Sequence, residues 1–204
     1  MPTLFSGDVV VEYSQIYVMS DPTEQLWLEV SFAGQSNGLC GAAWPGVLTL
    51  ITGSHTGEVE FTVELHDREP PVDRVWEDVV EVSFAPRSPQ LALVQSTTEQ
   101  SWPFELDQVD YRVRYSAVGM QDTPAIDSGS GWDTRPLPDR YLLQFWPGSA
   151  LPDVVLKQST SVAAYWHDYA RNLPAPSTPA STAKQRYHDI YKALSGVPFP
   201  GSAN

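Results

Sequence analysis

Apolar and polar residues alternate in short runs over the first three quarters of the chain. The clearest run spans residues 58–65, where Val59, Phe61, Val63 and Leu65 face one way and three glutamates and a threonine face the other. A period of two is typical of a half-buried β-strand. Runs rich in β-branched and aromatic residues predict further strands. These runs lie at 9–18, 47–52, 79–84, 91–94, 102–106, 110–117 and 140–146.

No segment with the period of a helix separates the early strands, which disfavours a parallel α/β fold. Eighteen prolines favour many short elements with turns between them. The sequence therefore predicts a mainly β protein in which residues 1–150 form an antiparallel β-sandwich of two packed sheets.

The pattern changes after Gly148, where the spacing of apolar residues becomes helical. Residues 159–172 predict a helix that begins with Ser159 or Thr160 as its cap. A proline-rich linker follows at 173–179, and residues 182–194 predict a second short helix. Residues 151–204 are thus expected to form a short helical C-terminal extension packed on the sandwich. The stripe expected to face the β body consists of Val162, Tyr165, Trp166 and Tyr169, and we expect its last three members to be buried.

Composition places the chain among globular proteins. It has 204 residues, of which 42% are hydrophobic, and a single cysteine that cannot form an internal disulfide. The first residues lack a positive segment and a long apolar run, and no stretch reaches the roughly 20 apolar residues of a membrane span. We expect a cytoplasmic protein with no membrane partner. Nine of the twelve basic residues are arginine, which is common in bacterial proteins from GC-rich genomes.

Charge is distributed unevenly along the chain. Residues 1–111 hold eighteen acids and three arginines, a net charge of −15, whereas residues 112–204 hold seven acids and nine bases. A surface formed by the acidic first part would either keep the protein soluble or attract a basic partner. It disfavours direct nucleic-acid binding, which needs basic patches. The candidate partner-binding residues are Glu58, Glu60, Glu64, Asp67, Glu69, Asp73, Glu77 and Asp78.

Catalytic and metal-binding motifs are missing from the sequence. The four histidines do not follow the spacing of zinc ligands, and there is no phosphate-binding Gly-Lys-Ser/Thr. Cys40 lies between glycines and could act with His55 or His66 only if the fold joined them in a pocket. We expect no cofactor.

Two stretches carry a resemblance to a known family. Val11–Val18 is an early strand with an aromatic residue two positions before Gln15, and Phe104-Glu105-Leu106 leads into Asp110-Tyr111-Arg112-Val113. Both are similar to the bacterial competence protein J family, the inhibitors of the DNA-entry nuclease. The chain departs from that family by an acidic insertion around Asp67–Asp78 and by everything after about Met120. The resemblance implies a small acidic inhibitor of a nuclease.

Three hypotheses follow for the function. The first is an inhibitor or immunity-type protein whose acidic face blocks a basic partner, such as a nuclease or toxin. The second is a non-catalytic β-sandwich module that binds a protein or a glycan. The third, an enzyme built on Cys40 or a histidine, has the least support. The second would be favoured by exposed tryptophans, for which the candidates are Trp27, Trp44, Trp76 and Trp132.

Overall fold

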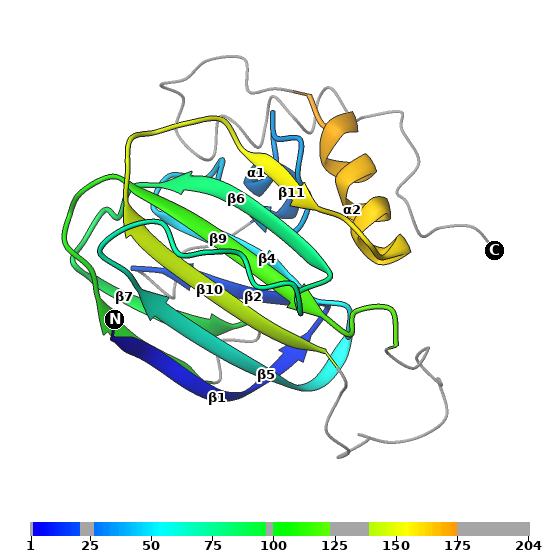
Figure 1. Ribbon diagram of the computed structural model, residues 1–204, viewed down its shortest axis with the longest axis horizontal. Helices are drawn as coiled ribbons and strands as arrows, with labels where there is room; N and C mark the ends of the chain where they lie inside the picture. Colours follow the sequence, from blue (N-terminus) through cyan, green and yellow to red (C-terminus); the bar gives the residue numbers. More distant parts are fainter. Residues whose placement is uncertain (1, 21–26, 97–99, 123–138, 175–204) are drawn as a thin grey trace.

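The computed structural model describes residues 2–20, 27–96, 100–122 and 139–174. Strands dominate this part of the chain, and a single long helix follows them (Figure 1). The strands are β1 (Thr3–Glu12), β2 (Gln15–Met19), β3 (Cys40–Gly41), β4 (Val47–Ile51), β5 (Thr56–Leu65), β6 (Asp78–Phe84), β7 (Gln90–Gln95), β8 (Ser101–Glu105), β9 (Tyr111–Val118), β10 (Arg140–Pro147) and β11 (Val154–Lys157). The helices are α1 (Leu28–Ser31) and α2 (Ser161–Asn172).

All eleven strands belong to one continuous sheet. Its order is β11-β6-β9-β10-β5-β1-β2-β4-β3, and β7 joins β2 to β8. The pairing of β1 with β2 is confined to the turn, where Glu12 faces Gln15. Beyond that point β2 leaves β1, so the sheet curls and brings β2, β4 and β7 behind β9 and β10 (Figure 1).

The prediction of a mainly β fold with a C-terminal helix is confirmed, but the antiparallel sandwich is not. One curled sheet takes the place of two separate ones, and it is mixed because β10 pairs in parallel with β5. The sequence predicts that residues 154–157 belong to the helical extension, but they instead form the edge strand β11 beside β6.

The main hydrophobic core lies inside the curl. Apolar residues of β2, β4 and β7 on one side meet those of β6, β9 and β10 on the other, and the hydroxyl of Tyr115 donates to the carbonyl of Ile51 across the core. Strand β9 is buried on both faces, since a second layer of chain covers its outer side. Charged side chains on the outer side of β9 are therefore removed from the surface.

The first predicted helix is confirmed, with Thr160 as its cap. The Thr160 side chain accepts from the backbone N–H of Ala163 at 3.1 Å. Its most deeply buried residues are not the predicted ones, since Ala163, His167 and Ala170 are buried. Of the predicted stripe, Val162, Trp166 and Tyr169 pack partly buried against the core, and Tyr165 is 48% exposed. The second predicted helix, at 182–194, lies outside the described residues.

Candidate interaction surface

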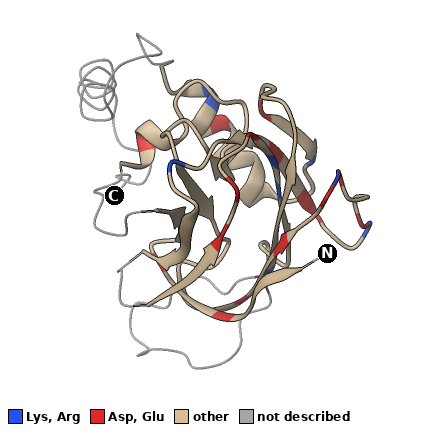
Figure 2. Cartoon of the chain, turned by 90° about the vertical axis from the view of Figure 1, so that its left-hand side faces the viewer, with Lys and Arg blue, Asp and Glu red and all other residues tan. Residues whose placement is uncertain are grey.

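The outer face of β5 carries exposed carboxylates, as its alternation predicts. Val59, Phe61 and Val63 are buried in the core, while Glu58 and Glu60 on the opposite face are exposed. The neighbouring strand β1 adds Asp8, which is exposed directly opposite Glu60. Asp8, Glu58 and Glu60 are called the acidic strip below. Figure 2 shows acidic positions spread along the strands, with few basic ones among them.

The acidic strip places like charges side by side. Directly opposed residues on antiparallel strands have Cβ atoms about 4.5–5.5 Å apart, and like charges at this position are destabilising. Arg140 of β10 is in register with Glu60 on its other side and is also exposed. Within the described ranges no ion pair neutralises Asp8, Glu58 or Glu60. The strip is therefore a concentrated negative charge that is open to solvent.

Four further predicted acids lie in the connection between β5 and β6, residues 66–77, and three of them are exposed. Asp67, Glu69 and Asp73 are all exposed there. Glu69 is also paired, since its carboxylate accepts from the Arg114 guanidinium at 3.0 Å. Asp73 accepts from the backbone N–H of Val75. The β5–β6 connection thus adds negative charge beside two arginines, Arg68 and Arg74.

The remaining three predicted acids hold the fold together. Glu64 is half-buried and binds His66 and Gln144, each at 2.9 Å. Glu77 accepts from the backbone N–H of Gly119 at 2.9 Å. Asp78 is fully buried, so it does not contribute to the exposed surface.

Asp78 fixes the start of α2. Its carboxylate accepts from the backbone N–H groups of Ser159 and Thr160, at 2.7 and 3.2 Å, and from the Thr160 hydroxyl at 2.7 Å. A buried carboxylate is stable only when it is fully hydrogen-bonded. The helix is thereby tied to the first residue of β6.

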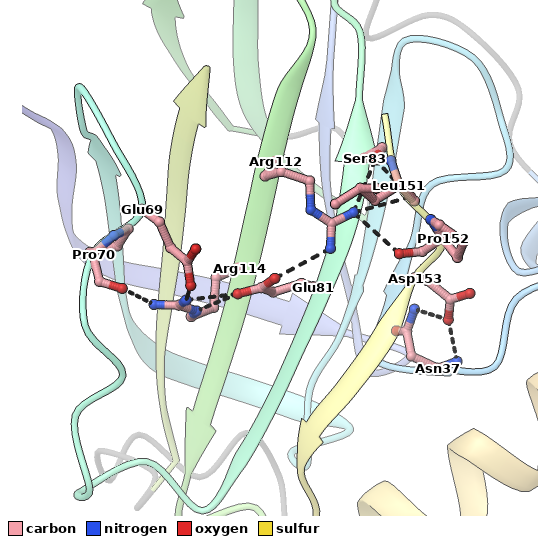
Figure 3. Close-up of polar contacts among 10 residues, drawn as sticks. All are labelled: Asn37, Glu69, Pro70, Glu81, Ser83, Arg112, Arg114, Leu151, Pro152 and Asp153. Atoms are coloured by element: carbon pink, nitrogen blue, oxygen red, sulfur yellow. Dashed lines mark hydrogen bonds and ion pairs between the residues drawn. The ribbon is translucent and has the colours of Figure 1, made fainter. Parts of the chain in front are cut away.

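Arg112 and Arg114 are buried, although they lie on the face of β9 opposite Tyr111, Val113 and Tyr115. Figure 3 shows both guanidinium groups converging on the carboxylate of Glu81. Arg114 donates to Glu81 at 2.7 and 2.9 Å and to the carbonyl of Pro70 at 2.6 Å, and its guanidinium lies 5.1 Å from the Trp146 ring centre. These contacts hold the β5–β6 connection over the outer face of the sheet.

The sequence contains a partial signal for this network. Arg112 and Arg114 alternate with buried aromatic residues, and Glu81 alternates with buried valines. What sequence alone cannot show is that β6 and β9 are neighbours, in register with Glu81 opposite Arg114.

The candidate nucleophile Cys40 is fully buried, and burial raises the pKa of its thiol, which keeps it protonated. His55 is exposed and contacts Thr56 rather than the thiol. Among the described residues no group of three or more His, Cys, Asp or Glu side chains could hold a metal ion. No described helix is long and apolar enough to cross a membrane.

A second polar cluster is also closed to solvent. The buried Asp139 carboxylate accepts from the Ser54 hydroxyl at 2.6 Å and from the Tyr141 hydroxyl at 2.5 Å. Burial, together with the charge of Asp139, raises the pKa of Tyr141 well above its usual value. Because neither Ser54 nor Asp139 is exposed, the cluster serves to join β10 to the turn before β5.

A shallow pocket of about 210 Å³ lies between the turn at Gly46 and the ends of β6 and β9. Ser83, Asp110 and Tyr111 supply its polar side chains. Ligand pockets usually measure roughly 300–1,000 Å³, so this one is small for a metabolite. The candidate tryptophans that the structure describes are not fully exposed: Trp44 is buried and Trp27 and Trp76 are partly buried, while Trp132 lies outside the described residues.

Comparison with known proteins gives a limited result. No protein-family model and no curated protein matches the chain. Two solved structures match. One is ComJ from Bacillus subtilis, an inhibitor of the DNA-degrading activity of NucA, at 16% identity and a TM-score of 0.46, covering 72% of this chain and 98% of that one. The other is crocagin biosynthetic gene J, at 17% identity and a TM-score of 0.42, covering 73% and 100%. The predicted resemblance to the competence protein J family is confirmed as a weak structural one.

Proposed function

We propose that this protein binds a basic protein and inhibits it, with the acidic strip filling a cationic cleft of the partner. The observation that supports this most directly is the pairing of Asp8 with Glu60. Two exposed carboxylates face each other across β1 and β5, and neither forms an ion pair with a described residue, although Arg140 of β10 lies in register beside Glu60. An arrangement that is unfavourable in the free protein becomes favourable when a cationic surface covers it.

The spacing of the carboxylates along β5 also suits a site that binds phosphates. Residues on one face of a β-strand repeat every 6–7 Å, roughly twice the rise per residue. Glu58 and Glu60 follow this spacing, which is comparable to that of successive phosphates along a nucleic-acid backbone. We therefore propose a nuclease-type partner, whose phosphate-binding site would accept carboxylates in place of phosphates.

The exposed acids of the β5–β6 connection would extend this contact. Asp67 and Asp73 are exposed, and Glu69 shares its charge with Arg114. Three predicted acids form internal hydrogen bonds and therefore serve the fold rather than the partner: Glu64, Glu77 and Asp78.

The test compares two sets of charge reversals. Partners captured from the native host are identified, and their affinity is measured for the wild type, for the double variant Glu58→Lys/Glu60→Lys and for Glu105→Lys. Glu105 is an exposed acid at the end of β8, a strand that pairs with β7 and with neither strand of the strip, and serves as the control. Close interfacial charge pairs couple by about 1.5–7 kcal/mol, so the double variant should weaken binding at least about ten-fold. Glu105→Lys should have little effect.

Salt gives an independent measurement. Association driven by exposed charge should slow strongly between about 50 and 500 mM salt. A captured partner that is acidic or neutral, or an affinity that ignores both the reversals and salt, would refute the proposal. The general protein- or glycan-binding module would then be the better description.

A further inference from the structure

An exposed aromatic pair lies at one end of the acidic strip. Tyr13, in the turn between β1 and β2, is 66% exposed, the most exposed of the large apolar side chains described. Its ring meets the ring of His55 edge to face, with centroids 5.5 Å apart. His55 is exposed as well, and it directly precedes β5.

The turn holds Tyr13 in a fixed position. The backbone N–H of Ser14 donates to the carbonyl of His55 at 3.1 Å, and the carbonyl of Ser14 accepts from the backbone N–H of Thr52 at 3.0 Å. The Gln15 amide donates to the carbonyl of Tyr13. Tyr13 and Ser14 both have left-handed backbones, with φ of 57° and 58°. A large side chain is uncommon there, and the hydrogen bonds on both sides hold this backbone in place.

Strand register connects this pair to the strip. On the outer face, Asp8 lies opposite Glu60, Val10 opposite Glu58 and Glu12 opposite Thr56. The Thr56 hydroxyl hydrogen-bonds to Nδ1 of His55 at 2.8 Å. The aromatic pair therefore continues the strip, with the carboxylates of Glu12 and Glu58 on its approach.

We propose that Tyr13 and His55 receive an arginine side chain of the partner, an inference that rests on the proposed function. The planar guanidinium stacks on an aromatic face while its N–H groups reach neighbouring carboxylates, which an ammonium group does less well. Exposed tyrosines held in place are frequent anchors of protein interfaces. The negative charge around this pair selects a cationic residue as its occupant.

Two peptides of equal charge, nona-arginine and nona-lysine, serve as probes. Their dissociation constants are measured by calorimetry at pH 8 and low salt against the full-length protein. The wild type should bind nona-arginine about five-fold more tightly than nona-lysine. Tyr13→Asn should abolish this preference, since asparagine tolerates the left-handed backbone and leaves the turn folded. Tyr165→Ala, which removes an exposed tyrosine of α2, should retain it.

Each outcome separates the two proposals. Equal affinity for both peptides, or a preference that survives Tyr13→Asn, overturns the role of the aromatic pair. If Glu58→Lys/Glu60→Lys still lowers the affinity for both peptides far more than Glu105→Lys does, the function proposed for the acidic strip stands without the aromatic pair. If the strip reversals and the control lower the affinity equally, the proposed function fails, and so does the inference that rests on it.

Discussion

Arg114 carries its charge almost completely inside the protein. Its side chain is 1% exposed, and it shares the carboxylate of Glu81 with Arg112. Burying charged groups costs several kcal/mol each, and removing one partner leaves the other uncompensated. Two buried cations thus depend on one buried anion, while Glu69 contributes from the surface with a side chain that is 66% exposed.

Glu81→Gln and Glu69→Gln make a matched pair that measures this difference. Glu81→Gln should lower the free energy of unfolding by about 3–5 kcal/mol, because both guanidinium groups lose their buried counter-charge. Glu69→Gln should cost less than about 1 kcal/mol, as expected for an exposed ion pair. Urea denaturation of both variants provides the measurement. Equal costs would mean that the buried carboxylate of Glu81 stabilises the protein no more than the exposed one of Glu69.

His167 is fully buried in α2 with one ring nitrogen paired. Nδ1 accepts from the backbone N–H of Gly38 at 2.9 Å, and Nε2 has no partner among the described residues. Burial, and secondarily the charge of Arg171, lowers the pKa of His167. The folded protein therefore holds this ring neutral at a pH where the unfolded chain already takes up a proton.

The sign of the pH dependence follows from that lowered pKa. Stability from neutral His167 is fully present above the unfolded value of about 6.5 and falls as pH drops towards the folded pKa. The loss should reach at most about 1.4 kcal/mol per pH unit. His167→Asn, whose amide oxygen can accept from Gly38, should flatten the profile between pH 7.5 and 5.5. Parallel unfolding profiles for the two proteins would show that His167 does not titrate on unfolding.

At the scale of elements, α2 approaches the loop before β3 very closely. A Cβ atom on Gly38 would lie 1.8 Å from the carbonyl oxygen of Trp166 and 2.9 Å from the backbone nitrogen of His167. Backbone atoms cannot turn aside as a flexible side chain can. Gly38 is therefore required for the helix to dock in this position.

Gly38→Ala tests that requirement, and Gly7→Ala is its control. The first should destabilise the protein by about 1–3 kcal/mol, because α2 must shift outward. At Gly7 of β1, an added Cβ would meet only the Phe5 ring at 3.5 Å, an ordinary contact, so stability should hold or rise slightly. Thermal unfolding compares the two. A Gly38→Ala variant as stable as Gly7→Ala would contradict the close docking of α2.

The same contact explains why the sequence predicts the extent of α2 but not its buried face. Periodicity locates apolar side chains, and it singles out Tyr165, Trp166 and Tyr169. A helix that docks backbone to backbone instead buries small residues, here Ala163 and Ala170. Trp166 and Tyr169 flank the contact and are half-buried, and Tyr165 points away. Close approach depends on Gly38, 128 residues earlier than Trp166, and no local pattern contains that information.

The candidate surface was predictable to a similar degree. Alternation correctly identifies Glu58 and Glu60 as outward-facing, because that rule depends only on the strand itself. It cannot tell that the outer face is open at Glu60 but covered at Glu64 by His66 and Gln144. Asp78 and Glu81 follow these glutamates in the sequence but are buried, since their partners come from residues 112–160.

At the scale of the whole molecule, the uneven charge along the chain is partly neutralised by folding. Two of the bases after residue 111, Arg112 and Arg114, bind Glu81. Lys157 and Arg171 also reach back to the acidic part, but they bind uncharged backbone carbonyls there, those of Arg74 and Trp76 and that of Ser36. Arg140 is the base in register with the acidic strip, beside Glu60, and no ion pair between the two is formed within the described ranges. The fold thus leaves its negative charge concentrated on β1 and β5.

Whole-molecule topology was the least predictable level. The sequence predicts which segments are strands, but the pairing of β5 with β10 joins residues 80 positions apart, such as Glu60 and Arg140. Hydrophobic patterns specify which face of a strand is buried and do not identify its neighbour. A parallel pair between two antiparallel halves is therefore visible only in the folded structure.

That parallel pair also determines the order in which the protein can be completed. β1 and β5 can pair once 65 residues have been made, and β6, β9 and β10 can assemble among themselves later. The joint between β5 and β10 closes the middle of the sheet, and it must wait for residues 140–145. Contacts between distant residues are slow to form, and an open strand edge invites pairing with other chains until they do. We expect the carboxylates of Glu58, Glu60 and Glu64 on β5 to disfavour such pairing, because the same charges on a second copy of the strand would repel them.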